Sequence, residues 1–244
     1  MAEKPMSLLA IIPARGGSTG VLKKNIRSFA GKPLIVHTIE AAKGAASVSR
    51  VVVSTDSEEI AAVAKDAGAE VPVLRPAELA TKESKVLDAV LHLLAHLKTE
   101  ESYEPTYILL LQPTSPLRTS DDIEKAVALF IANDADSLVS VCRTENVLMT
   151  KDANNVLHFE NPEMLATPNR QELPAYYKFD GSMLYLVDTK KLITERTFFP
   201  GKLVGYEIPR WRAIDLDEPQ DFVVGELLFE NKGEIEARLE HFDT

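Results

Sequence analysis

The stretch that decides the fold is Leu8-Leu9-Ala10-Ile11-Ile12, an unbroken aliphatic run that leads through Pro13 and Ala14 into Arg15-Gly16-Gly17. A short run that is apolar throughout, rather than alternating, is typical of a strand buried on both faces. Comparable apolar runs predict further strands at 51–53, 71–74, 107–111, 138–141 and 203–208. Amphipathic patterns predict helices at about 33–46, 57–68, 87–97, 120–131 and 219–231. This alternation predicts an α/β fold, doubly wound, around a mainly parallel sheet.

The rhythm of strands and helices changes between Thr144 and Asp188, where the sequence is polar, contains prolines and shows few helical stripes. We interpret residues 144–188 as a hairpin-like insertion in a single domain that spans residues 1–244. The insertion has too little apolar patterning to form a core of its own. A two-fold related copy of the chain is the commonest surface for such a segment to pack on, so we predict a homodimer with 144–188 as its dimerisation insertion.

Composition excludes several classes of protein. The 244 residues include 27 Lys and Arg against 37 Asp and Glu, and the resulting net charge of -10 argues against nucleic-acid binding. The single cysteine, Cys142, cannot form a disulfide within the chain, and we interpret it as a core residue. No apolar run approaches the roughly 20 residues that span a bilayer, and 8–12 is too short for a signal peptide. We therefore expect a cytoplasmic protein without a membrane partner.

The first candidate site is the loop Arg15-Gly16-Gly17-Ser18-Thr19-Gly20, which is followed by Lys23, Lys24 and Asn25. Ligands of α/β proteins bind at the carboxyl ends of the strands, and glycines let backbone N–H groups approach a phosphate there. The loop is neither a Walker A loop nor a Gly-x-Gly-x-x-Gly fingerprint. Taken alone, it fits a glycine turn with solvated lysines as well as it fits a phosphate site.

Two more segments carry candidate residues. The turn Leu111 to Arg118 holds two prolines that present Gln112 and Arg118 near the same sheet edge, either as ligand contacts or as a rigid connection. Asp215 and Asp217 lie on one face if their segment is extended, and paired carboxylates suit Mg²⁺. An Asp-x-Asp pair alone is a weak signal, however, and by itself Asp217 fits better as the cap of the helix that begins near Pro219. His92 and His96 lack the glutamate of a zinc-binding helix, so we interpret them as a solvated face.

Together, these segments resemble the acylneuraminate cytidylyltransferases, the family of the CMP-sialic acid synthetases and their nonulosonate relatives. The resemblance covers nearly the whole chain in the expected order. The stretches that carry it are Ile12 to Ser18 with Lys24-Asn25, His37-Thr38-Ile39, Val53 to Asp56, Leu74 to Ala80, Leu111 to Arg118, Arg170 to Pro174, Phe198-Phe199 and Ile214 to Asp217.

The resemblance implies transfer of CMP from CTP to the C2 hydroxyl of a nonulosonic acid, a nine-carbon α-keto acid sugar, with release of pyrophosphate. It implies nucleotide binding by Arg15, Gly16, Gly17, Ser18, Lys24, Asn25 and Arg75, and Mg²⁺ binding by Asp215 and Asp217, which act in catalysis with Lys24. It implies sugar binding by Gln112, Arg170, Tyr185, Phe198 and Phe199. Arg170 and the two phenylalanines would reach across a dimer interface, whereas burial statistics alone place Phe198 and Phe199 in the core.

The sequence differs from the usual family pattern at several positions, namely Thr19, Leu22, Lys82, Val86, Met149 and Asp180. The first four affect the nucleotide loops and the last two affect the sugar region. Two alternatives stay open on these grounds. One is a cytidylyltransferase for an eight-carbon keto-acid sugar, and the other is a nucleotide-binding homologue that has lost turnover.

Overall fold

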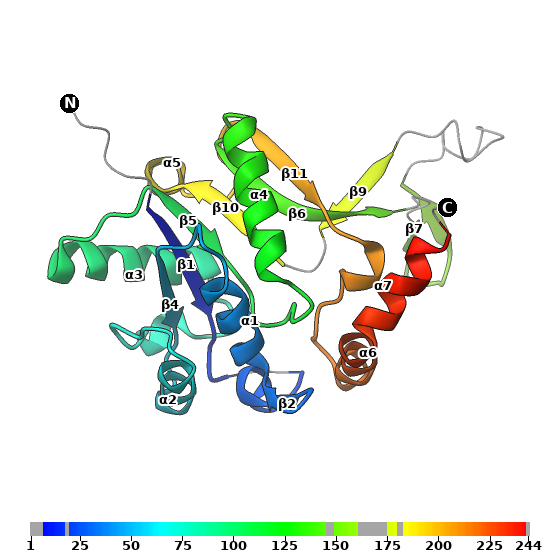
Figure 1. The fold of residues 1–244 in the computed structure, drawn as a ribbon, viewed down its shortest axis with the longest axis horizontal. Coiled ribbons are helices and arrows are strands. Elements are labelled where there is room, and N and C mark those ends of the chain that lie inside the picture. Colours follow the sequence, from blue (N-terminus) through cyan, green and yellow to red (C-terminus); the bar gives the residue numbers. More distant parts are fainter. Residues whose placement is uncertain (1–6, 18–19, 145–148, 161–174, 180–182, 243–244) are drawn as a thin grey trace.

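A seven-stranded sheet forms the centre of the computed structural model, which describes residues 7–17, 20–144, 149–160, 175–179 and 183–242 (Figure 1). Its strands follow the order β11-β6-β10-β5-β1-β4, and β9 pairs with β6. Their bounds are β1 Leu8–Pro13, β4 Arg50–Ser54, β5 Tyr107–Leu110, β6 Ser137–Thr144, β9 Tyr176–Phe179, β10 Tyr185–Asp188 and β11 Leu203–Glu207. Five of these strands are the predicted apolar runs that begin near residues 8, 51, 107, 138 and 203.

The pairing confirms the mainly parallel sheet and adds one feature that the pattern does not predict. Strands β4, β1 and β5 pair in parallel, and β11 pairs in parallel with β6. Strand β10 lies antiparallel between β5 and β6 and joins these two groups. Residues 185–188 of the predicted insertion are therefore a central strand, and the predicted boundary at Asp188 lies too far along the chain.

Helices cover both faces of the sheet, which confirms the doubly wound arrangement. One face carries α1 (Leu34–Lys43), α2 (Glu58–Asp66) and α4 (Ser120–Ala132), and the other carries α3 (Val86–Glu101) and α5 (Thr189–Glu195). Side-chain caps fix the helix starts, because Ser57 accepts the Ile60 N–H and Thr119 forms a capping box with Asp122. The cap of α4 is thus Thr119.

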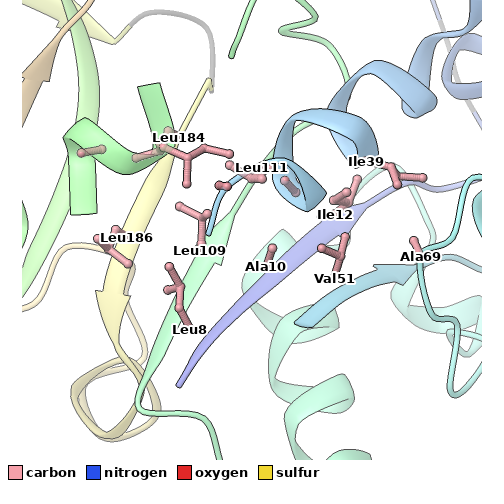
Figure 2. Packing of buried hydrophobic residues seen from close by; sticks show 14 of the residues in the cluster. Leu8, Ala10, Ile12, Ile39, Val51, Ala69, Leu109, Leu111, Leu184 and Leu186 are labelled. Atoms are coloured by element: carbon pink, nitrogen blue, oxygen red, sulfur yellow. The ribbon is translucent and has the colours of Figure 1, made fainter. Parts of the chain in front are cut away.

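The two faces divide the residues of β1 between two apolar clusters. Leu8, Ala10 and Ile12 pack with Leu109 of β5 and Ile39 of α1, as Figure 2 shows. The intervening Leu9 and Ile11 pack on the other face, against the Val90, Leu93 and Leu97 side of α3. A strand whose neighbouring residues are all buried explains why the run at 8–12 is continuous rather than alternating.

The remaining strands and α-helices of the described residues lie around the sheet. They are the hairpin β2 (Ser28–Phe29) and β3 (Lys32–Pro33), the hairpin β7 (Met149–Lys151) and β8 (Leu157–Phe159), and the C-terminal helices α6 (Pro219–Glu230) and α7 (Lys232–Glu240). The predicted strand at 71–74 does not form. Instead, Glu70 makes an isolated bridge with Val52, and Pro72 offers no N–H to continue a ladder. Within the described residues, no helix is both long enough and apolar enough to span a membrane.

Candidate active site

A cavity of about 520 Å³ opens at the carboxyl ends of β1, β4 and β5. Helices α1 and α2, which follow β1 and β4, lie on one face of the sheet, and α3, which precedes β5, lies on the other. The chain passes from β1 to β4 on one side and then returns to place β5 on the other side of β1, so the strand order reverses there. Such a reversal is where α/β proteins bind ligands. The described residues that line the cavity are Pro13, Arg15, Gly20, Lys24, Asn25, Arg75, Leu79, Thr81, Lys82, Ser84, Lys85, Val86, Gln112, Pro113, Thr114, Asp217 and Glu218.

The glycine loop is held against the cavity by contacts within the chain. The Gly16 N–H donates to the Asp56 carboxylate at 2.9 Å, and the Asn25 side-chain amide donates to the Arg15 carbonyl at 3.0 Å. A Cβ atom at Gly20 would lie 2.3 Å from the carbonyl oxygen of Asp217, so a larger residue cannot fit without moving the backbone. The loop therefore lies directly on the Asp-x-Asp segment.

Not all of the predicted nucleotide-binding residues of the loop line the cavity. Arg15 and Asn25 line it, whereas Gly16 and Gly17 are not among the described lining residues and Gly17 is exposed. Ser18 and the divergent Thr19 lie outside the described residues.

Lys24 and Asp217 meet at the cavity, although 193 residues separate them in sequence. The Lys24 ammonium lies 2.8 Å from one Asp217 carboxylate oxygen, with 17% of the lysine side chain and 68% of the aspartate side chain exposed. Asp215 is half-buried and is not among the described residues that line the cavity. Between the two aspartates, the Leu216 N–H donates to the Thr114 carbonyl at 2.9 Å, which ties this segment to the turn after β5.

Two arginines fix the neighbouring loop. Arg75 is buried and donates to the Ser54 carbonyl at 2.6 Å and to its hydroxyl at 3.2 Å. Burial lowers the pKa of the Arg75 guanidinium, an effect that Asp56 opposes and Arg15 reinforces. Arg15 donates to the Thr81 carbonyl at 2.6 Å. Both predicted nucleotide-binding arginines thus lie at the cavity. Arg75 is buried and binds the end of β4, and Arg15 binds the backbone of the loop that begins at Thr81.

The loop Thr81 to Val86, which the resemblance assigns to the nucleotide loops, lines the cavity with residues that were not among the predicted site residues. Thr81 and Ser84 bond to each other, with their hydroxyls 2.9 Å apart, and Ser84 also donates to the Glu78 carbonyl. Lys82 and Val86, which depart from the family pattern in this loop, line the cavity beside Lys85. The resemblance therefore marked the position of the loop, although not which of its residues line the cavity.

The turn after β5 separates the roles of its two polar residues. Gln112 lines the cavity. Arg118 is buried instead and donates to the Thr38 hydroxyl at 2.7 Å, to the Gln112 carbonyl at 3.1 Å and to the Met183 carbonyl. Arg118 therefore holds the backbone that presents Gln112, and it is not among the described lining residues.

The predicted aromatic sugar contacts form a cluster of their own, and none of them is among the described residues that line the cavity. Tyr185 packs beside Phe198 and Phe199, with ring centroids 6.1 and 5.9 Å apart, and Phe199 also lies 5.7 Å from Phe179. Phe198 is partly buried against the α3 cluster, whereas Phe199 remains 41% exposed, so the burial-based prediction of a core pair is wrong for Phe199. Arg170 and Asp180 lie outside the described residues. Cys142 is fully buried beside Met183 and Ile208, as predicted.

The cavity is cationic in a chain of net charge -10. Its described lining has two acidic side chains, Asp217 and Glu218, against five basic ones, Arg15, Lys24, Arg75, Lys82 and Lys85. In the described residues, no group of three His, Cys, Asp or Glu side chains is arranged to hold a metal by itself. The arrangement suits a polyanionic ligand that brings its own oxygen atoms to any cation bound there.

Comparison with known proteins also points to a protein that binds a nucleotide. A family model described as cytidylyltransferase matches residues 9–222. The chain is 37% identical to a CMP-N,N'-diacetyllegionaminic acid synthase of Legionella pneumophila, over 92% of this chain and 97% of that protein. It is 32% identical to an N-acylneuraminate cytidylyltransferase of Escherichia coli over 88% of this chain, and it spans about half of that longer protein (50%).

A solved structure supports the fold. The structure of a CMP:2-keto-3-deoxy-manno-octonic acid synthetase complexed with CTP superposes with a TM-score of 0.67 at 16% identity, covering 93% of this chain and 99% of the other.

Proposed function

Because the chain belongs to the cytidylyltransferase family, we propose that it transfers CMP from CTP to the C2 hydroxyl of a nonulosonic acid and releases pyrophosphate. The observation that carries the proposal is the cation-lined cavity in which the glycine loop, Lys24 and Asp217 meet. The identity to nonulosonate synthases over more than nine-tenths of the chain supports this acceptor class over an eight-carbon sugar.

The residues of the cavity suit the demands of this reaction. When the hydroxyl attacks the α-phosphorus of CTP, the bond from that phosphorus to the β-phosphate bridging oxygen breaks, and negative charge leaves with pyrophosphate. Lys24 and Arg15 line the cavity and can neutralise phosphate oxygens. Asp217 is an exposed carboxylate at the same place and can accept the proton of the attacking hydroxyl.

We also propose that Asp215 and Asp217 hold Mg²⁺ during the reaction. The donor set fits, because Asp217 already holds a cation, the Lys24 ammonium, and Mg²⁺ commonly takes one or two carboxylates together with substrate phosphates. When bound, Mg²⁺ would supply charge to stabilise the transferring phosphoryl group. Lys24 would then be released from Asp217 to bind phosphate oxygens.

A homodimer is the third part of the proposal. The residues of β7 and β8 are exposed throughout, and they include Met149, Leu157 and Phe159. Exposed aromatic side chains continue on β9 with Tyr177 and Phe179. Apolar surface gathered in this way is typical of an interface between subunits. A second copy seated here would cover the hairpin and lie close to the aromatic cluster at Tyr185, which contacts Phe179 of β9 through Phe199.

A pyrophosphate-release assay tests the activity directly. Four nucleoside triphosphates are crossed with sialic, legionaminic and pseudaminic acids and with an eight-carbon keto-acid sugar. We expect turnover with CTP and a nonulosonic acid, with legionaminic acids preferred. Faster turnover with the eight-carbon sugar would show that the acceptor is an eight-carbon keto-acid sugar rather than a nonulosonic acid. CTP binding without turnover of any acceptor would support the homologue that has lost activity.

A further inference from the structure

The carboxylate of Asp122, in the first turn of α4, is almost completely buried and receives an unusually full set of donors. Its side chain, in a residue 2% exposed, accepts bonds of 2.9 and 2.7 Å from the two terminal nitrogens of Arg212 and one of 3.0 Å from the Tyr206 hydroxyl. The Thr119 N–H and hydroxyl add bonds of 2.8 and 2.7 Å. A bidentate guanidinium–carboxylate pair is among the strongest and most directional polar contacts that a protein makes.

This set of donors exceeds what a helix cap needs, since Thr119 alone completes the capping box. Burial would raise the pKa of Asp122, but the hydrogen bonds and charge of Arg212 hold that pKa below its usual value. Burial and the Asp122 charge raise the pKa of Tyr206, so its hydroxyl stays protonated as a donor. The ion pair between Asp122 and Arg212 is therefore a fixed point of the structure, with 3% and 13% of the side chains exposed.

Arg212 lies three residues before Asp215, so the fixed point is adjacent to the Asp-x-Asp segment. The Ile214 N–H donates to the Arg212 carbonyl at 2.9 Å, which continues the constraint along the backbone. At the other end, Leu216 is tied to Thr114 by its N–H, and its side chain is fully buried in a cluster with Phe29 and Phe222. The segment that carries both carboxylates is thus held by α4 and by the turn after β5, and the Asp217 N–H also donates to the Asp221 carboxylate of α6 at 3.0 Å.

We propose that Arg212, held by Asp122, is a positioning residue that fixes the carboxylates of Asp215 and Asp217 for cation binding; this rests on the proposed Mg²⁺ site. Two carboxylates two residues apart repel each other in the absence of a cation, so a free segment would separate them. A buried ion pair fixes the backbone that carries both carboxylates before the cation arrives, so less ordering is needed when it binds. Neither Arg212 nor Asp122 is among the described residues that line the cavity.

The experiment compares Arg212→Met and Arg212→Lys with a matched control, Arg50→Met. Arg50 is also a largely buried arginine, with 16% of its side chain exposed, and it forms ion pairs with Glu70 and Glu101 at 2.5 and 2.7 Å. It lies at the amino end of β4, whereas the cavity lies at the carboxyl ends of the strands. Three quantities are measured for each purified protein. They are the Mg²⁺ concentration that gives half-maximal kcat, the binding of Mn²⁺ alone followed by electron paramagnetic resonance, and the melting temperature.

We expect Arg212→Met to raise the half-saturating Mg²⁺ concentration and the Mn²⁺ dissociation constant by about tenfold or more, as loss of outer-shell support commonly does. KM for the nonulosonic acid should change much less. Arg212→Lys keeps the charge but cannot donate to both Asp122 oxygens in parallel, so its metal values should fall between those of wild type and Arg212→Met. This variant remains informative if the methionine variant folds poorly. Arg50→Met should lower the melting temperature without changing either metal value.

Two results would overturn the assignment in different ways. Wild-type metal values in both Arg212 variants, with melting temperatures lowered as in Arg50→Met, would make the ion pair purely structural. Wild-type activity that needs no divalent cation would remove the Mg²⁺ proposal itself, and the positioning role would be lost with it.

Discussion

The cavity at the ends of β1, β4 and β5 differs from the region of β7, β8 and β9 in what its side chains contact. At the cavity, Lys24 pairs with Asp217 and Gly16 bonds to Asp56. In the second region, Phe159 and Phe179 are 43% and 58% exposed. The polar side chains named at the cavity are paired within one chain, whereas β7, β8 and β9 carry apolar side chains that are exposed to solvent. Under the proposed function, the cavity is the nucleotide region, and the surface of β7, β8 and β9 belongs to the acceptor region, which a further subunit would cover.

The strongest test of the nucleotide region is Asp217→Asn. The amide keeps the size of the side chain but removes the charge that the proposed cation site needs, so kcat should fall by about three orders of magnitude. Steady-state kinetics measure the loss, and circular dichroism checks that the fold is intact. Near-normal turnover of a folded Asp217→Asn protein would exclude the metal assignment.

A smaller effect within the same region is expected from Lys24→Ala. Loss of one charged donor to phosphate should weaken CTP binding by roughly 10- to 100-fold, because such a bond contributes about 1.5–3 kcal/mol. Binding of the free sugar should hardly change. Calorimetric titration of each ligand separates the two effects, and Lys43→Ala, at the distant end of α1, is a matched surface control. Equal CTP affinity in the Lys24→Ala and wild-type proteins would contradict the role.

The acceptor region can be tested by mixing two inactive variants, Arg170→Ala and Asp215→Ala. If Arg170 completes the site of the other subunit, a mixed dimer contains one intact site and one doubly damaged site. Random exchange makes about half of all dimers mixed, so activity should recover to about a quarter of the wild-type rate. Sedimentation of labelled chains monitors the exchange. Demonstrated exchange with no recovered activity would mean that each site is built from one chain.

The smallest expected effect concerns His37, which helps to attach α6 beside the cavity. Its Nε2 lies 2.9 Å from the Phe29 carbonyl, and its ring packs on Phe229 at 4.8 Å. Burial lowers the pKa of His37 below 6.5. As the pH falls below 6.5, the unfolded chain therefore takes up a proton before the folded chain does, and stability is lost.

The change in free energy of unfolding should be about 1 kcal/mol between pH 7.5 and 5.5. In His37→Gln, which keeps a donor for the Phe29 carbonyl, this dependence should be reduced. Urea unfolding at several pH values measures the difference. Parallel pH dependences in the two proteins would show that other groups control acid stability.

The same contrast describes what could be predicted from the sequence. Continuous apolar runs and helix caps are local signals, so the run at 8–12 and the helix after Ser57 were predicted correctly, and the family motifs brought Lys24 and Asp217 to one site. The antiparallel placement of β10 was not predictable, because pairing between distant strands leaves no local pattern. Arg212 was missed for a related reason: its partner Asp122 lies 90 residues away.

The position of β10 has a consequence for the order in which the chain can fold during synthesis. Strands β1, β4 and β5 lie within the first 110 residues and can pair as soon as they emerge from the ribosome. In contrast, β6 reaches this group only through β10, which is made more than 40 residues later. Until then, the apolar edges of β5 and β6 have no partner strand between them. A nascent chain that stalls between residues 144 and 185 would expose the free edge of β5 and a β6 strand that lacks β10 and β11, and this interval is where a chaperone would protect it from aggregation.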